Sequence, residues 1–179
     1  EDNKVYLFDK DSSTPLWSYE ADDHIVSVAI SADGEYITVG SNDNKVYLFD
    51  KDSSTPLWSY STGNSVRSVS ISSNGDYIVV GSSDDHKVYL FDKDSNTPLW
   101  SYTTGDEVGS VAISADGEYI VAGSRDNKAY FHRQDWPIIN DIVKNDIYAT
   151  DELPIVLKPD YSYSGSYISY YKWMIGNNT

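Results

Sequence analysis

A short acidic loop, repeated three times, holds the residues best suited to bind a metal ion. It reads Asp-Lys-Asp-Ser-Ser-Thr from Asp9 and again from Asp50, and Asp-Lys-Asp-Ser-Asn-Thr from Asp92. Calcium-binding loops use oxygen-bearing side chains at alternate positions, because hard cations need several oxygens from one tight turn. The loops lack the turn glycine and distal glutamate of an EF-hand, and Asp and Ser also bond backbone amides in plain turns. A plain turn is the favoured interpretation, and the alternative is a calcium site made by Asp9, Asp11, Asp50, Asp52, Asp92 and Asp94.

Histidine and cysteine, which serve most metal and nucleophilic sites, form no cluster in this sequence. The histidines His24, His86 and His132 fall at different phases of the repeat, so each should project at a different place. The chain has no cysteine, which excludes disulfides, thiolate metal sites and cysteine nucleophiles. The sequence therefore predicts no catalytic residue and no cofactor other than the calcium alternative.

Carboxylates and tryptophans also recur at fixed positions of the repeat. They are Glu35, Asp76 and Glu118, and Trp17, Trp58 and Trp100. Glycoside hydrolysis needs two carboxylates about 5–10 Å apart across a cleft, which copies displaced by a whole repeat do not supply. We expect these carboxylates on a solvated surface. The tryptophans could be sugar platforms, but their equivalent positions favour a packing role.

The chain is strongly acidic. Its net charge is −15, from 28 acidic against 13 basic residues. A nucleic-acid-binding protein needs a basic stripe to neutralise phosphates, so this function is disfavoured, as is attraction to an anionic membrane. No signal-like or membrane-spanning run is visible, and we expect no direct membrane insertion by this segment.

The elements that would position these residues follow from a long internal repeat. The stretch DNKVYLFDKDSSTPLWSY (residues 2–19) returns at residues 43–60 and, slightly changed, at residues 85–102. Its tryptophans lie 41 and 42 residues apart. A period of about 40–45 residues is typical of four-stranded propeller blades.

Each repeat predicts four short antiparallel strands. In the middle copy these are residues 66–72, 76–82, 86–93 and 97–105, rich in Val, Ile, Tyr, Phe and Trp. An Asn-Gly or Asp-Gly pair joins the first two strands as a tight hairpin. The strands are apolar on both faces, as expected for stacked blades, and a proline near the start of the fourth strand places it at the blade's outer edge. The predicted buried positions are Val5, Leu7, Val28, Ile30, Ile37, Val39 and their repeat equivalents.

With these residues placed, the chain resembles WD-repeat and quinoprotein-type β-propeller blades over residues 1–133. Residues 108–130 resemble the WD-repeat order of strand, Asp-Gly turn, strand, Gly-Ser and Asp turn. Residues 90–105 resemble a quinoprotein-type blade, in which an Asp is followed by a turn and a Trp. The Gly-His pair of many WD repeats is missing, so their histidine-centred hydrogen-bond network should be absent. The fold class that follows is all-β, a propeller fragment of about three blades.

The ends of the repeat region carry further expectations. The chain opens inside a blade, so we expect two strands, two full blades and a last blade of three strands. This favours a piece of a longer propeller, and the alternative is a short arc that assembles into a ring. Residues 134–146 are expected to be a linker. Residues 147–179 resemble the first half of an Ig-like domain of the polycystic-kidney-disease (PKD) type, through Tyr171, Trp173 and Gly176.

The near-identical copies differ mainly at one end of the predicted blades. The differences fall in the loops between blades, at the start of the first strand and after the second strand, and alternate connections of a four-stranded blade share one end. Loops on a rigid scaffold are where binding is concentrated, although neutral drift among duplicated loops is an equal alternative. The candidate partner-binding residues are Asp23, His24, Val26, Asn42, Asn64, Arg67, Ser83, Asp106, Glu107, Gly109 and Arg125.

These observations favour a non-enzymatic binding or scaffold module that contacts a protein or glycan through this rim. Propeller blades followed by a PKD-type domain resemble surface proteins of archaea and some bacteria, which implies an extracellular location. The alternatives are a catalytic propeller, quinoprotein-like or lyase-like, whose site lies in blades outside this sequence, and a purely structural surface-layer component. Apolar blade faces at each end of the arc should make this piece self-associate.

Overall fold

The computed structural model describes residues 2–133 and 139–142, and every regular element in them is a β-strand. The chain divides into two compact units, residues 1–146 and 147–179. The PKD-type prediction concerns the second unit and lies outside the described residues. The strands are β1 (Lys4–Phe8), β2 (Pro15–Glu20), β3 (Ile25–Ile30), β4 (Tyr36–Ser41), β5 (Lys45–Asp50), β6 (Trp58–Ser61), β7 (Val66–Ile71), β8 (Tyr77–Ser82), β9 (Lys87–Asp92), β10 (Trp100–Thr103), β11 (Val108–Ile113), β12 (Tyr119–Ser124), β13 (Ala129–Arg133) and β14 (Ile139–Ile142).

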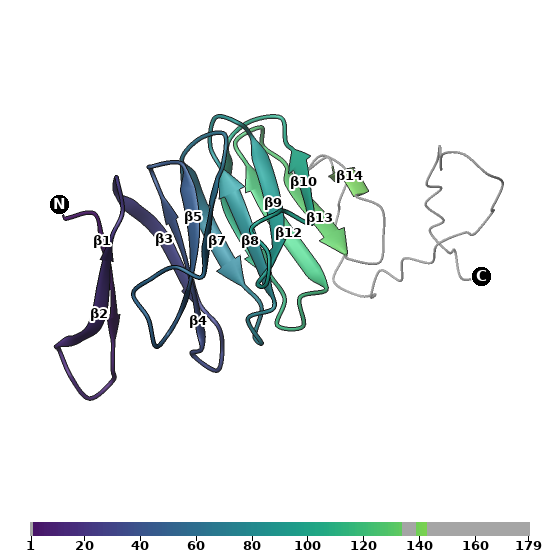
Figure 1. Ribbon diagram of the computed structural model, residues 1–179. Helices are drawn as coiled ribbons and strands as arrows, with labels where there is room; N and C mark the ends of the chain where they lie inside the picture. The colour runs from purple at the N-terminus through teal and green to yellow at the C-terminus, as the bar shows by residue number, and fades with distance from the viewer. Residues whose placement is uncertain (1, 134–138, 143–179) are drawn as a thin grey trace, which may run out of the picture. The chain divides into compact units, whose positions relative to one another are not determined.

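The strands form one two-stranded and three four-stranded antiparallel sheets, each in simple chain order. These are β1–β2, β3–β6, β7–β10 and β11–β14, which lie side by side in that order (Figure 1). The strand with the nearby proline lies at an edge of its sheet in β2, β6 and β10, as predicted. The expected all-β blade architecture is confirmed.

Local sequence explains the hairpins that join the first two strands of each blade. Gly34, Gly75 and Gly117 have φ angles of 76°, 77° and 78°. This left-handed conformation is easy for glycine and strained for most other residues. The Asp-Gly and Asn-Gly pairs therefore fix the turn and the strand register.

The core lies between the sheets. The face that β3–β6 turns toward the next blade packs Val46 and Leu48 against Val69, Ile78 and their neighbours on β7–β10. The next pair of blades repeats this arrangement in a second buried cluster. The tryptophans tie neighbouring blades together, because Trp58 Nε1 donates to the Lys93 carbonyl of the following blade at 2.7 Å. They are packing residues here, as the sequence favoured.

The inner strands show the fan-like arrangement of propeller blades. β7, the first strand of its sheet, contacts the first strands of both neighbouring sheets, β3 and β11, extensively. The outer strands β6 and β10 are at most weakly in contact. The blades therefore approach one another at the inner edge and spread at the outer edge.

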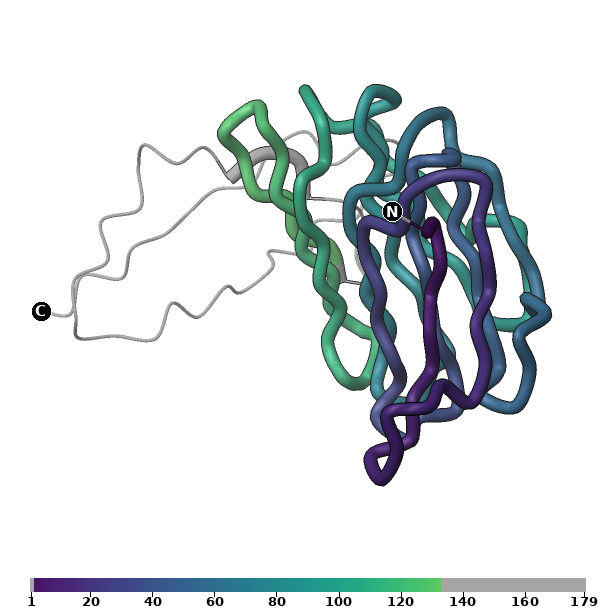
Figure 2. Tube along the Cα trace, turned by 90° about the vertical axis from the view of Figure 1, so that its left-hand side faces the viewer, coloured from purple at the N-terminus to yellow at the C-terminus, as the bar shows by residue number. Residues whose placement is uncertain are grey.

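Two expectations need correction. The last blade has a fourth strand, since β14 pairs with β13, so a strand lies within the range expected to be a linker. Val28 and Ile30, expected to be buried, are 57% and 53% exposed, whereas their equivalents Val69 and Ile71 are 6% and 9% exposed. The reason is that β1 and β2 cover only part of the next sheet, as Figure 2 shows from the side of β1.

Within the described residues there is no helix long and apolar enough to span a membrane.

The buried interface predicts a large penalty for truncating its aliphatic side chains. Leu48 is fully buried and Ile71 is 9% exposed, so replacing either with Ala should lower the free energy of unfolding by about 2–5 kcal/mol. Leu57→Ala is the control, because Leu57 is 52% exposed and its loss should change stability by about 0.5 kcal/mol or less. Urea unfolding followed by tryptophan fluorescence measures both, and equal effects would contradict the assigned core.

Candidate binding rim

The residues that differ between copies lie together at one end of the blades, which we call the variable rim. It comprises the inter-blade loops 20–24, 61–65 and 103–107, the first-strand residues Val26, Arg67 and Gly109, and the residues Asn42, Ser83 and Arg125 that follow the second strands. In every blade the residue after the second strand donates its N–H to a carbonyl of the inter-blade loop, at 2.9–3.0 Å. These bonds place the candidate residues of each blade side by side.

A repeated hydrogen-bond network holds these loops in place. In the β7–β10 blade, Asp85 Oδ2 accepts hydrogen bonds from Tyr89 Oη at 2.5 Å and from Gly63 N at 3.1 Å. Ser82 Oγ donates to the Asn64 carbonyl at 3.0 Å. The aspartates of the adjacent blades bind equivalently, Asp43 to Tyr47 and Asp22 N, and Asp126 to Tyr130 and Gly105 N. The chain thus has an Asp–Tyr anchor, whereas the WD-repeat resemblance pointed only to a missing histidine network.

The pKa shifts of the tyrosines agree with these Asp–Tyr hydrogen bonds. Burial, helped by the hydrogen bond to Asp126, raises the pKa of Tyr130 to about 12. Burial and the bonded aspartate likewise raise the pKa of Tyr47 and of Tyr89. Although burial alone would raise the pKa of Asp126, the hydrogen bonds that it accepts lower it. The phenols therefore stay protonated around neutral pH and keep donating to the aspartates.

The first-strand residues of the rim sit at β-bulges. The register of β3 with β4 skips between Ile25 and Ser27, and the same skip occurs around Arg67 and Gly109. A bulge leaves one residue out of the pairing and redirects its side chain. Val26, Arg67 and Gly109 are all exposed, and they lie on the adjacent inner strands. The copies thus present an apolar, a cationic and a small residue on one edge.

The rim charges are partly paired. Arg125 Nη1 lies 2.9 Å from Glu107 Oε2, Lys45 Nζ lies 2.8 Å from Asp22 Oδ2, and His24 Nδ1 lies 2.7 Å from Asp23 Oδ1. Among the described residues, no carboxylate oxygen lies within 4.0 Å of the Arg67 guanidinium. Arg67 is therefore an exposed cation that follows the uncharged loop 61–65, while the loops 20–24 and 103–107 of the neighbouring blades are acidic. Its charge is open to a partner.

Several of the remaining candidate residues have a structural role in the loops of the variable rim. Ser83 is 1% exposed and donates to Asn64 Oδ1 at 3.0 Å, so it shapes the loop and does not meet a partner directly. Asn42 has a buried Oδ1 with no hydrogen-bond partner among the described residues. Asp106 Oδ1 caps its own loop by accepting from Glu107 N at 2.7 Å. Some residues that differ between copies thus bond to other variable residues of the same loop region, so these positions change together.

The candidate calcium loops are built as turns at the opposite end of the blades. Oδ1 of Asp9, Asp50 and Asp92 accepts a hydrogen bond from the amide two residues later, at 2.8 Å in each copy. The second aspartates lie beside lysines, with Lys10 Nζ 2.6 Å from Asp11 Oδ1. These contacts give the loops a structural role. Calcium binding there stays the alternative to the plain turn that the sequence favours.

The repeated carboxylates and the histidines that the sequence offered as catalytic or metal-binding candidates lie apart from one another. Glu35 pairs with Lys51 at 2.5 Å and Asp76 with Lys93 at 2.8 Å, beside the lower hairpins. His86 takes the turn position before β9 with a φ of 56°. In the part of the chain that the structure describes, no group of three or more His, Asp or Glu side chains could hold a metal ion.

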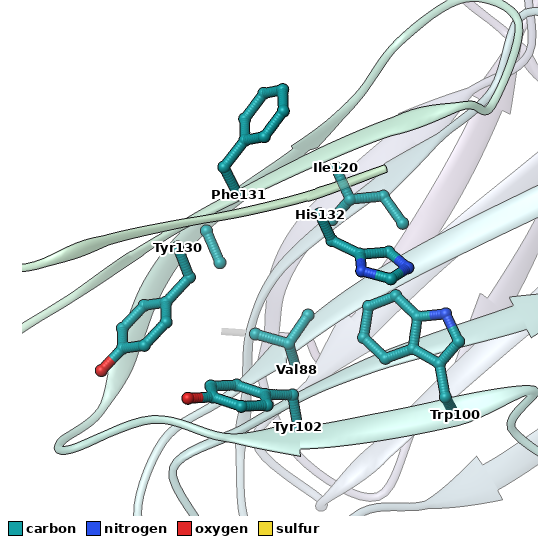
Figure 3. Close-up of a pocket in the computed structure, with 8 residues that line it drawn as sticks. Val88, Trp100, Tyr102, Ile120, Tyr130, Phe131 and His132 are labelled. Atoms are coloured by element: carbon teal, nitrogen blue, oxygen red, sulfur yellow. The ribbon is translucent and has the colours of Figure 1, made fainter. Parts of the chain in front are cut away.

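His132 lies at an incompletely packed junction between the β7–β10 blade and the β11–β14 blade. It takes the repeat position of Phe49 and Phe91, and its ring lies 4.7 Å from Trp100 between centroids. Next to it is a cavity of about 20 Å³, lined also by Tyr102 and Tyr130, while Phe131 points away from it (Figure 3). His132 Nδ1 is buried without a hydrogen-bond partner among the described residues, and burial lowers the pKa of His132.

Because of this junction, we expect the stability of the protein to fall at low pH, and we expect phenylalanine at position 132 to reduce that loss. The lowered pKa means that the folded state favours neutral histidine, so stability from this site is present above pH 6.5 and is lost as pH falls below it. His132→Phe should fill the gap, add up to about 1 kcal/mol, and gain more over the wild type at pH 5 than at pH 8. Thermal melts at sub-micromolar chain concentration measure this. His24→Gln, in an exposed loop, is the control, and an unchanged pH difference in His132→Phe would contradict the assignment.

Comparison with known proteins agrees with this geometry. The sequence profile of a family described as outer membrane protein assembly factor BamB matches residues 1–136, the range that holds β1 to β13. No curated protein matches the chain significantly. The family is built from quinoprotein-type repeats and forms β-propellers, so the predicted resemblance to quinoprotein-type blades is confirmed. The chain belongs to the BamB-type family of quinoprotein-like β-propellers.

Proposed function

We propose that the chain is a non-enzymatic binding module of a cell-surface or extracellular protein, and that it contacts a protein or glycan through the variable rim. The observation that carries the proposal is Arg67, which is exposed at a bulge on the inner edge and has no carboxylate within 4.0 Å among the described residues. A guanidinium recognises a carboxylate through two parallel hydrogen bonds. The partner is therefore a protein or glycan that presents a carboxylate to this edge.

The arrangement of the rim supports binding by a rigid surface. The Asp–Tyr anchors and the serine hydroxyls beneath the loops are the same in each blade, and two of the three loops add a threonine hydroxyl, whereas the exposed residues above them change. Thr104 Oγ1, for example, donates to the His86 carbonyl at 2.9 Å, and Thr62 Oγ1 donates to the Asn44 carbonyl at 2.9 Å. A preorganised surface loses little conformational entropy when it binds.

Membership of a family described as an assembly factor supports contact with other proteins. The extracellular location rests on the combination of propeller blades with the PKD-type pattern in residues 147–179. A PKD-type domain would act as a spacer that carries the propeller away from an attachment point.

The test compares Arg67 with its paired counterpart. Binding is measured by biolayer interferometry to acidic oligosaccharides, to neutral oligosaccharides and to peptides with and without carboxylates. Arg67→Ala should weaken binding to the carboxylate-bearing probes by about tenfold or more, because a charged hydrogen bond contributes about 1.5–3 kcal/mol. Arg125→Ala is the matched control, since Arg125 already pairs with Glu107, and it should have a smaller effect. Binding that is insensitive to Arg67, or absent from every probe, would count against the proposal.

The quinoprotein-type repeat keeps a catalytic propeller as the second candidate. Its test is dye-linked oxidation of alcohols with added quinone cofactor and calcium, together with assays on polysaccharides and phosphate esters. We expect no turnover from this 179-residue chain. Activity that disappears when His24, His86 or His132 is replaced would overturn this expectation and favour an enzyme.

A further inference from the structure

We propose that Asn74 is a modification site, which loses its side-chain amide by spontaneous deamidation, and that the packing of the β3–β6 sheet against the β7–β10 sheet controls the reaction. Asn74 and Gly75 form the only Asn-Gly pair of the sequence. They lie at the tip of the hairpin that joins β7 to β8, at the end of the blades opposite the variable rim. The inference is therefore independent of the proposed function.

The reaction needs only the neighbouring backbone and water. The amide nitrogen of Gly75 attacks Cγ of Asn74, so that a new N–Cγ bond forms and the bond from Cγ to Nδ2 breaks. Ammonia leaves with the proton that Gly75 N gives up, and a succinimide ring remains. Water then opens the ring at either of its carbonyls, which gives aspartate or isoaspartate. Glycine favours the attack because it has no side chain to obstruct it.

The side chain of Asn74 is exposed, so water reaches the reacting groups. The two neighbouring hairpins have Asp33 and Asp116 at this position. In all three hairpins Oδ1 of this residue accepts a hydrogen bond from the hydroxyl of the serine two positions earlier. The turn therefore has room for aspartate, one of the two products.

Hydrogen bonds hold the reacting groups in an unreactive arrangement. Gly75 N donates to the Ser72 carbonyl at 3.0 Å, so the nucleophilic nitrogen is engaged. Asn74 Nδ2 donates to Asp76 Oδ2 at 2.6 Å, and Asn74 Oδ1 accepts from Ser72 Oγ at 2.8 Å. These bonds must break before the side chain can turn toward Gly75 N and close the ring.

The neighbouring blades hold the tip of the hairpin in place. The ring of Tyr36, on β4, lies so close over Gly75 that even a methyl group there would collide with it. Ring closure changes the backbone torsion just before Gly75, which the tyrosine ring opposes. Ser73 N donates to the Ala115 carbonyl, and the Ser73 carbonyl accepts from Ala32 N, both at 2.9 Å. The tip is thus fixed from both sides.

Deamidation therefore requires the junction between the β3–β6 and β7–β10 sheets to open. Local opening has its own free energy, and the rate of a reaction that depends on it scales with the fraction of open molecules. Tyr36 packs against the buried cluster between these two sheets, so removal of its ring favours opening. Asn74 is protected while the junction is closed.

The products weaken the same junction. Asp76 Oδ1 lies 2.8 Å from Lys93 Nζ, and the Lys93 carbonyl accepts the Trp58 Nε1 hydrogen bond that ties the two blades together. Aspartate at position 74 cannot donate to Asp76 and places a second negative charge beside it. Isoaspartate adds an atom to the backbone of the hairpin and disturbs its register. Because neither product returns to asparagine, modified chains accumulate.

The next junction contains a second copy of this arrangement. The ring of Tyr77 lies over Gly117 as the ring of Tyr36 lies over Gly75. Asp116 precedes Gly117, and an Asp-Gly pair forms the same succinimide with loss of water in place of ammonia. Each tyrosine therefore protects a different hairpin, which supplies a matched control.

The first measurement compares Asn74 in the folded chain with Asn74 in a synthetic peptide of residues 70–79. Both are incubated at mildly alkaline pH, and deamidation is followed by peptide mapping with mass spectrometry. The folded chain should react at least about tenfold more slowly than the peptide, because the tip must open first. Equal rates would overturn the proposed protection.

The second measurement uses Tyr36→Ala and Tyr77→Ala as a matched pair. Tyr36→Ala should raise the deamidation rate of Asn74 by about tenfold or more and leave isoaspartate formation at Asp116 near its wild-type rate. Tyr77→Ala should have the opposite selectivity. Tyr36→Phe keeps the ring and should leave both rates unchanged. If each alanine variant accelerates both sites equally, or neither site, the assigned control by the junction is wrong.

The third measurement tests the effect of the aspartate product on stability. Asn74→Asp should lower the urea midpoint of unfolding at neutral pH, because it removes the hydrogen bond to Asp76 and adds repulsion. Adding Asp76→Glu gives Asp-Gly-Glu, the sequence of the other two hairpins, where Glu35 reaches Lys51 at 2.5 Å. The double variant should recover most of the loss. An Asn74→Asp chain as stable as the wild type would contradict the claim that deamidation weakens this junction.

Discussion

Apolar strands with two dry faces need a neighbour on each side, and this requirement governs the rest of the structure. A β-sheet whose two faces are both apolar is stable only when other layers cover both faces. The β7–β10 sheet has such neighbours, and Val79, Val80 and Leu90 are at most 1% exposed. Val28 and Val121 have the same residue type, but no sheet among the described residues covers them, and they are exposed. Burial in this chain is thus a property of the stack, and no blade has a complete core of its own.

Because of the same constraint, different parts of each blade provide stability and binding. The blade faces carry the apolar contacts, while the ends of the sheets carry loops that need only satisfy their backbone groups. Asp85 and Tyr89 meet that need at the second blade, together with Ser82 beneath the loop. Residues above this anchor, such as Arg67, can change between copies without disturbing the packing. A rim that varies over a fixed scaffold is the arrangement expected of a binding surface.

The repeat predicted most of the strands, because each strand's pattern and each Asn-Gly or Asp-Gly turn is encoded locally. Burial was less predictable, since Val28 and Val69 lie in nearly identical sequence contexts and differ only in what covers them. The Asp–Tyr anchor had a visible signal, an aspartate four residues before a tyrosine, but its bond to Gly63 joins residues 22 positions apart in the chain. β14 was missed because residues 139–142 do not follow the sequence of the other outer strands.

The most direct test of the stacking account is amide hydrogen exchange in equivalent third strands. β9 is covered on both faces, whereas β13 has an imperfect inner contact at His132 and an exposed outer face. The account predicts that the amides of Val88, Tyr89 and Leu90 exchange only through global unfolding, and that those of Ala129, Tyr130 and Phe131 exchange much faster through local opening. Equal protection of the two strands would contradict the claim that neighbouring blades stabilise each sheet.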